Sequence, residues 1–287
     1  MPENMVPKTG HGPGTAASAR NLQERVVSGV VMVLVALALA YAGPIPFALL
    51  IVAVSLVMCW EWGHLVRATS ADASFALHGA AVVAAIGLAM GGLPLLAFAV
   101  AVAGTLAMFA VSYTQRPALS AVGVSYVALP AAALVWLRHD EPNGFAAVIF
   151  LFLIVWTTDT MAFVFGRTIG GAKLCPSISP NKTWAGFFGG IVSSAVMAAL
   201  FAALIPGASS LRLGLIGLAL GVIAQMGDLA ESALKRVLGV KDASHLIPGH
   251  GGVMDRMDGV VTVALAAAVF AVFWNGTAPA LTLLIGG

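Results

Sequence analysis

The sequence predicts an all-α, polytopic integral membrane protein with about nine transmembrane helices and a cytosolic N-terminus. Of the 287 residues, 60% are hydrophobic and only 9% are charged, whereas a soluble domain is about 45–50% apolar and about 25% charged. The mean hydropathy is +0.99. This composition excludes a disordered protein and disfavours a soluble globular enzyme. The net charge of +2 is too weak to predict nucleic-acid binding.

The predicted helices are apolar runs of about the length that a membrane-spanning helix needs, about 20 residues. Because lipid cannot hydrogen-bond free backbone groups, each run is expected to be helical. Turn residues such as Gly43-Pro44 and Pro206-Gly207 separate the runs. The runs lie at about 26–42, 45–63, 75–91, 93–113, 120–137, 145–166, 184–205, 211–233 and 258–275.

Both ends of the chain are expected to lie outside the spanning helices. Residues 1–24 are polar and rich in Gly, Pro and Ala, which predicts a disordered cytosolic tail. Residues 276–287 are apolar but too few to cross a bilayer.

The basic residues predict the orientation in the membrane. Twelve of the fourteen Lys and Arg fall in the N-terminal tail and in the even-numbered gaps between runs, whereas only Arg138 and Arg212 fall in odd-numbered gaps. Because cytosolic loops carry an excess of Lys and Arg, the N-terminus and the even gaps are expected in the cytosol and the C-terminus outside. The composition and the lack of a transit peptide predict a multi-pass protein of a bacterial cell inner membrane.

Charged residues concentrate in one third of the chain. The segment from Asp159 to Asp258 holds six of the twelve acids and eight of the fourteen Lys and Arg. We therefore expect residues 25–140 to form an N-terminal transmembrane scaffold and residues 141–287 to form a C-terminal catalytic region.

The first polar motif ends an apolar run at residues 225–236. Asp228, Glu231, Ser232 and Lys235 follow helical spacing, which places them on one face. A carboxylate at bilayer depth costs about 2.5–3.5 kcal/mol, so these acids require a metal, a cation or a water-filled cavity. A purely structural ion pair with Lys235 is the alternative, and it is weighed most heavily for Glu231.

The second motif covers residues 241–259. Its Pro and Gly residues predict a loop whose backbone approaches a ligand closely. Asp255 and Asp258 follow where the last helix begins, and one such acid is ordinary at a helix N-terminus. Two acids beside a glycine loop indicate Mg²⁺, and the basic residues Lys235, Arg236, Lys241 and Arg256 suit phosphate oxygens. Zinc is disfavoured because the Cys ligands are missing.

A third element pairs Asp159, inside a predicted span, with the run Ser179-Pro-Asn-Lys182-Thr183. A Ser or Thr there could cap the next helix, whose N-terminus would attract phosphate; a plain helix cap is the alternative. Neither GxxxxGK[ST] nor GxGxxG occurs. The run Trp60-Glu61-Trp62 with His64 is interpreted as a structural interfacial belt.

Residues 232–258 resemble the signature of the phosphatidate cytidylyltransferases (CDP-diacylglycerol synthases) over 27 positions without a gap. Gly227-Asp228-Leu229, the run 179–184 and Asp159 resemble further family positions in the same order. Three positions depart from the usual pattern, namely Phe163, Asn181 and Ala185.

The resemblance implies transfer of CMP from CTP to phosphatidic acid, giving CDP-diacylglycerol and pyrophosphate, with Mg²⁺ as cofactor. It assigns Asp228 and Asp255 to the metal, and we expect Asp258 and Asp159 to complete the metal shell. Lys235 and Arg256 join the two metal acids as catalytic residues. The substrate-binding set is Ser179, Lys182, Thr183, Ser232, Arg236, Lys241, Asp242, His250, Gly251 and Gly252.

The expected partners are the two substrates and the lipid bilayer, and a homodimer is left open. The alternatives are an enzyme that passes the CTP group to another lipid or polyprenyl phosphate, a cation-coupled transporter using Asp159, Asp228 and Glu231, and an inactive scaffold subunit. Acids that cluster with Lys and Arg on the cytosolic side argue against the transporter.

Overall fold

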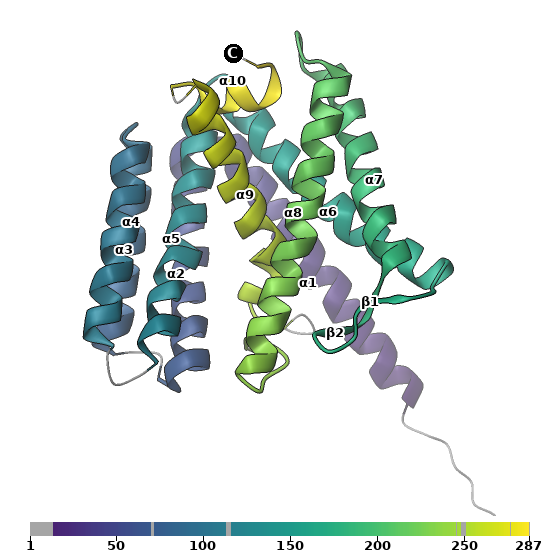
Figure 1. Ribbon diagram of the computed structural model, residues 1–287, viewed down its shortest axis with the longest axis horizontal. Helices are drawn as coiled ribbons and strands as arrows, with labels where there is room; N and C mark the ends of the chain where they lie inside the picture. Colours follow the sequence, from purple (N-terminus) through teal and green to yellow (C-terminus); the bar gives the residue numbers. More distant parts are fainter. Residues whose placement is uncertain are drawn as a thin grey trace, which may run out of the picture.

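The computed structural model describes residues 14–69, 72–112, 116–244, 246–247, 251–275 and 277–286. Within these residues the chain is a bundle of nine long helices (Figure 1). Eight of them are long and apolar enough to cross a membrane, and the apolar part of the first, Val26–Ala42, is shorter. The helices are α1 (Gly14–Ala42), α2 (Pro44–Arg67), α3 (Ala73–Met90), α4 (Pro94–Val111), α5 (Pro117–His139), α6 (Gly144–Thr168), α7 (Trp184–Phe201), α8 (Ser210–Val237) and α9 (Met254–Asn275).

The prediction of an all-α membrane protein with about nine helices is confirmed, with differences at the helix ends. Helix α1 already begins at Gly14, within the segment expected to be a tail. The residues there include Ala, Arg, Gln and Glu, which are good helix formers, so the helix continues beyond its apolar part. Residues 1–13 lie outside the described part of the chain.

The apolar C-terminal tail forms α10 (Pro279–Leu284), which is only six residues long and, as expected, too short to span. The carboxylate of Asp140 accepts hydrogen bonds from the backbone N–H groups of Ala280, at 2.7 Å, and Leu281, at 3.1 Å. The guanidinium of Arg212 donates to carbonyls at the other end of α10. The segments around Asp140 and Arg212, which fall in the fifth and seventh gaps between the predicted runs, are thereby joined to the C-terminal segment.

One element departs from the all-helical expectation. Strands β1 (Lys173–Cys175) and β2 (Ser179–Thr183) form a two-stranded antiparallel hairpin between α6 and α7. Paired strands satisfy the backbone of a connection that the sequence predicts only as a loop and a helix cap. Figure 1 shows the hairpin at the same end of the bundle as the start of α1 and the end of α8, with the C-terminus at the opposite end.

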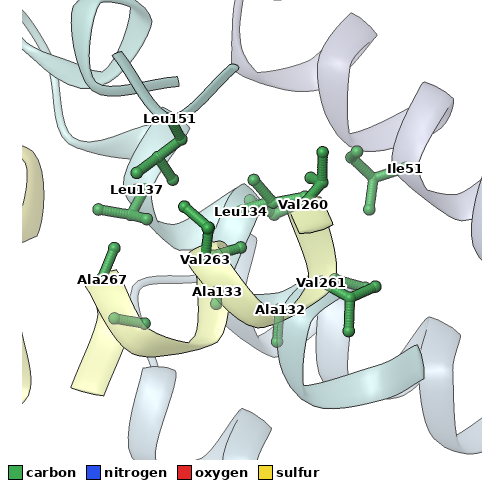
Figure 2. Close-up of a cluster of buried hydrophobic side chains, with 14 of the residues drawn as sticks. Ile51, Ala132, Ala133, Leu134, Leu137, Leu151, Val260, Val261, Val263 and Ala267 are labelled. Carbon is green, nitrogen blue, oxygen red and sulfur yellow. The ribbon is translucent and has the colours of Figure 1, made fainter. Parts of the chain in front are cut away.

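The core lies where α2, α5, α6 and α9 meet. Helix α5 is the most enclosed of the candidate spans, with 67% of its apolar window buried. Small side chains such as Ala132, Ala133 and Ala267 let α5 and α9 approach each other, while Leu134 and Val263 fill the space between (Figure 2). Helices α6, α7 and α8 pack at least as closely on the other side, through glycines.

We expect Gly190→Leu to lower the stability of the bundle. A Cβ atom at Gly190 in α7 would lie 2.8 Å from the Thr158 carbonyl oxygen and 2.9 Å from Gln225 Nε2, and such overpacking costs about 1–3 kcal/mol. The matched control is Gly87→Leu in α3, where nothing lies within 4 Å. Thermal unfolding in detergent should show a lower Tm for the first variant only; equal shifts would contradict the close packing of α6, α7 and α8.

Candidate active site

A cavity of about 1260 Å³ opens between α1, α2, α6 and α9 and is closed at one end by the hairpin and α8. The walls that α1 and α2 contribute are entirely apolar, with Val31, Val35, Leu50 and Val54 among them. The end lined by β2 and α8 is charged. Its ionisable residues are Asp159, Arg167, Lys182, Asp228, Lys235, Asp242, Asp255, Arg256 and Asp258.

The charged end unites the motifs that the sequence singles out. Helix α6 brings Asp159, β2 brings Lys182 and Thr183, and α8 brings Asp228 and Lys235. The loop after α8 brings Asp242, and the first turns of α9 bring Asp255 and Asp258. All four residues predicted to be catalytic and all four predicted metal ligands line this one cavity.

The hairpin places the side chain of a lysine beside one of the acids. Lys182 Nζ lies 2.7 Å from Asp228 Oδ2, and Ser232 Oγ donates to the other oxygen of Asp228 at 3.3 Å. The next residue, Thr183, anchors the end of β2, because its Oγ1 accepts from the Gly186 N–H at 3.1 Å and caps α7. The predicted helix cap is therefore confirmed, and it holds the backbone beside Lys182 in place.

Asp255 holds the loop between α8 and α9 in place. Its Oδ1 accepts from Lys235 Nζ at 2.6 Å, and its Oδ2 accepts from the backbone N–H groups of Gly252, at 2.8 Å, and Ala243, at 3.0 Å. One carboxylate thus binds the loop backbone at two separate points, Ala243 and Gly252. Gly251 adopts a φ of 81°, and a Cβ atom there would lie 2.8 Å from Asp255 Oδ2, so glycine is needed for both conformation and space.

Glu231 supports this arrangement from behind. It is buried, it accepts a hydrogen bond from Lys235 Nζ at 3.1 Å, and it lies 3.5 Å from the Tyr126 hydroxyl of α5. It does not belong to the cavity lining. The sequence left two interpretations of Glu231 open. In the described part of the chain, its contacts fit the structural ion pair with Lys235.

The four aspartates Asp159, Asp228, Asp255 and Asp258 line the cavity from three helices, α6, α8 and α9. In the described part of the chain no three Asp, Glu, His or Cys side chains converge closely enough to hold an ion by themselves. Mg²⁺ is usually bound by one or two carboxylates together with substrate phosphates, so a preformed cage is not required. Carboxylates that face one cavity beside basic side chains fit an ion that is shared with a nucleotide.

The remaining predicted substrate-binding residues differ in where they lie relative to the cavity. Asp242 lines the cavity, and Gly251 and Gly252 shape the loop. Ser179, Arg236 and Lys241 are not part of the lining; the Arg236 guanidinium donates to the carbonyls of Ile178, at 3.3 Å, and Val240, at 3.5 Å, and so braces the hairpin. His250 lies outside the described residues, and its predicted role stays a prediction.

Sequence reasoning missed two residues of the first half of the chain. Glu61 in α2 and Tyr126 in α5 both reach the region around the loop. For Glu61 the available signal was a carboxylate inside an apolar run, the same signal that singled out Asp159. The two flanking tryptophans made an interfacial belt the simpler interpretation.

Comparison with known proteins identifies the class. Residues 23–274 match the Cytidylyltransferase family, and the chain belongs to this family. A protein of Brucella abortus named phosphatidate cytidylyltransferase is 39% identical over 257 residues, which cover 88% of this chain and 95% of that protein. Proteins with the same name from Staphylococcus epidermidis, 45% identical over 122 residues (42% of this chain and 47% of that protein), and Rickettsia felis, 40% over 139 residues (46% and 60%), are also similar.

We expect Lys235→Met to destabilise the protein. The substitution leaves the Glu231 and Asp255 side chains, only 1% and 6% exposed, without their shared cation, and removing one partner of a buried pair costs about 3–5 kcal/mol. Lys235→Met combined with Glu231→Gln should recover part of the loss, because one uncompensated charge is removed. Unfolding in detergent measures both; a single variant as stable as the parent protein would contradict the bridging role.

Proposed function

We propose that this protein is a phosphatidate cytidylyltransferase, which transfers CMP from CTP to phosphatidic acid and releases pyrophosphate. The observation that carries the proposal is the single cavity whose charged end adjoins apolar walls. A polyanionic nucleotide fits the first part and the acyl chains of a lipid fit the second. The similarity to proteins that bear this name over most of the chain supports the same reaction.

The reaction needs charge neutralisation more than proton transfer. The second pKa of a phosphate monoester is about 6, so the lipid phosphate is mostly a dianion at neutral pH and no general base is required. One of its oxygens bonds to the α-phosphorus of CTP, while the bond from that phosphorus to the bridging oxygen breaks and the electron pair leaves with pyrophosphate. The barrier lies in bringing two anions together in line.

The basic side chains at the charged end lower this barrier. Lys182, Lys235 and Arg256 line the same cavity from three different elements, so they can surround the phosphates from several sides. We propose that they hold the triphosphate and the lipid phosphate. Their placement on β2, α8 and α9 fixes the relative positions of the two substrates, which is what an in-line displacement requires.

We further propose that Asp228 and Asp255 hold Mg²⁺, with Asp258 and Asp159 completing its shell or orienting water. When bound, the ion neutralises charge on the CTP oxygens and orients the leaving group. Asp228 and Asp258 face the cavity from helices α8 and α9, which pack against each other. These two carboxylates thus come from two helices, and the contacts of Asp255 help to maintain the relative position of those helices.

The lipid is proposed to reach the cavity sideways from the bilayer and CTP from the cytosol. Valines of α1 and apolar side chains of α2, such as Leu50 and Ile51, form walls of the same cavity as the charged end. The twelve basic residues of the tail and even gaps favour a cytosolic location for that end, and we propose the bacterial inner membrane as the site of action. A homodimer stays a prediction.

Transfer of label from CTP into the lipid phase tests the activity. With purified protein, phosphatidic acid and Mg²⁺ we expect a labelled lipid product, and Asp228→Asn and Asp255→Asn should each lower turnover about 100-fold or more, as loss of one stabilising group at a transition state does. Glu141→Gln, a carboxylate-to-amide change with no contact to the cavity lining, is the matched control.

The outcomes of this assay separate the alternatives. Product formed only with a polyprenyl phosphate would mean that the acceptor is a different lipid phosphate, while the transfer of CMP from CTP would be unchanged. Near-parental turnover of Asp228→Asn and Asp255→Asn would contradict the metal assignment. An absence of both product and CTP binding would favour the transporter.

The native cysteines test the orientation. Cys175 in β1 is partly exposed, whereas Cys59 is buried. A membrane-impermeant maleimide should therefore label Cys175 in inside-out vesicles and leave it unlabelled in right-side-out vesicles. As the control, Ser210→Cys with Cys175→Ser places the thiol at the exposed start of α8, at the opposite end of the bundle (Figure 1). The reverse labelling pattern would refute the cytosolic active site.

A further inference from the structure

Glu61 is a carboxylate buried in the half of the chain that carries none of the motif residues. It lies in α2, and its exposed fraction is 0%. A buried carboxylate is tolerated only when its oxygens are well hydrogen-bonded or ion-paired. Among the described residues, no Lys or Arg forms an ion pair with Glu61. The groups that satisfy it therefore indicate what it does.

Three hydrogen-bond donors converge on this side chain, and all belong to the loop and helix that follow α8. Glu61 Oε1 accepts from Ser244 Oγ at 2.6 Å and from the Val253 N–H at 2.8 Å, while Oε2 accepts from the Met254 N–H at 2.7 Å. The donors lie 183 to 193 residues further along the chain. Glu61 thus joins α2 to the interior of the loop, at Ser244, and to its junction with α9, at Val253 and Met254.

The contact to Met254 places Glu61 at the N-terminus of α9. The first N–H groups of a helix have no partner within the helix, and the positive end of the helix dipole favours an anion there. The carboxylate caps α9 from another helix. The first turns of α9 carry Asp255, Arg256 and Asp258, so the position of the cap fixes the direction in which these side chains enter the cavity.

The loop is shaped to admit this carboxylate. A Cβ atom at Gly252 would lie 2.6 Å from Glu61 Oε1 and 3.0 Å from the Ala243 side chain, so any larger residue would displace Glu61. Asp255 binds the Gly252 and Ala243 N–H groups from the opposite side. The loop is therefore held between two carboxylates, one from α9 itself and one from α2.

We propose that Glu61 is a positioning residue for cytidylyl transfer, which fixes the α8–α9 loop and the start of α9 so that Asp255, Arg256 and Asp258 face the substrates. The inference rests on the proposed function of those residues. The role requires a carboxylate in particular, because all three contacts are donated to it. An amide at this position would turn its NH₂ group toward at least one backbone N–H.

Glu61→Gln tests the proposal in the full-length protein. We expect hydrogen exchange at the Val253 and Met254 amides to become about 10- to 100-fold faster, since each loses a charge-assisted bond. The kcat per folded molecule should fall about 10-fold or more, because small displacements of reacting groups have effects of this size. The Mg²⁺ concentration for half-maximal rate should rise, whereas the KM for phosphatidic acid should stay within about twofold, since the apolar walls are untouched.

Two further variants complete the design. Glu61→Asp keeps the acceptor-only group and should recover part of the kcat. Glu141→Gln makes the same chemical change at an exposed carboxylate that pairs with Arg138, and it should leave exchange at residues 253 and 254 and kcat unchanged. If Glu61→Gln does not fold, Ser244→Ala carries the test, because it removes one donor and leaves Glu61 in place; faster exchange at 253 and 254 with lower kcat is then expected.

The proposal would be overturned if Glu61→Gln kept the parental kcat per folded molecule, the parental Mg²⁺ dependence and the parental exchange rates. The same result in Ser244→Ala would overturn it where that variant is used. A lower Tm with unchanged kcat would also overturn it, because that result describes a residue that only stabilises the fold. Failure of the proposed function itself is distinguished by the exchange measurement, which needs no substrate: faster exchange without any transferase activity in the parent protein would refute the reaction and leave the contact established.

Discussion

The hydrogen bonds of the Asp255 carboxylate are the interaction on which the charged end of the cavity depends. One side chain binds the ammonium of Lys235 and the backbone N–H groups of Ala243 and Gly252 in the α8–α9 loop. It thereby adds to the packing between α8, which carries Asp228, and α9, which carries Asp258, a direct connection at the charged end. The contact thus sets the spacing of groups that are distant in the sequence.

The surrounding lipid explains why these contacts are so interdependent. Charged groups at membrane depth are expensive unless they pair with one another or face water, and the acids here meet lysines from other elements: Lys182 from the hairpin and Lys235 from α8. Helices α2 and α5 add Glu61 and Tyr126. The N-terminal helices, expected from the sequence to be a scaffold, therefore take part in building the site as well as its apolar walls.

The sequence predicted the helices well because one physical rule governs them: lipid leaves the backbone no other partner than itself. It also singled out Asp159 and Asp228, since a carboxylate inside a span is costly, and the structure places both at the same cavity. It could not predict the hairpin, the brace that Arg236 provides, or the cap that Glu61 provides for α9. The hairpin pairs residues at most ten positions apart, in a connection whose polar run also fits a loop and a helix cap. The contacts of Arg236 and Glu61 join residues far apart in sequence, such as the 193 positions that separate Glu61 from Met254.

Asp228 and Asp255, the two metal ligands that the family resemblance assigns, differ in how much bonding capacity they retain. A carboxylate offers about four acceptor sites, and three donors, Lys235 and the N–H groups of Ala243 and Gly252, already occupy Asp255. Asp228 is occupied by the side chains of Lys182 and Ser232, which can move without disturbing the backbone. A metal ion therefore meets less resistance at Asp228, and at Asp255 it can use about one remaining site. A change at Asp255 alters both loop and metal, so the change at Asp228 is the more direct measure of the metal's contribution.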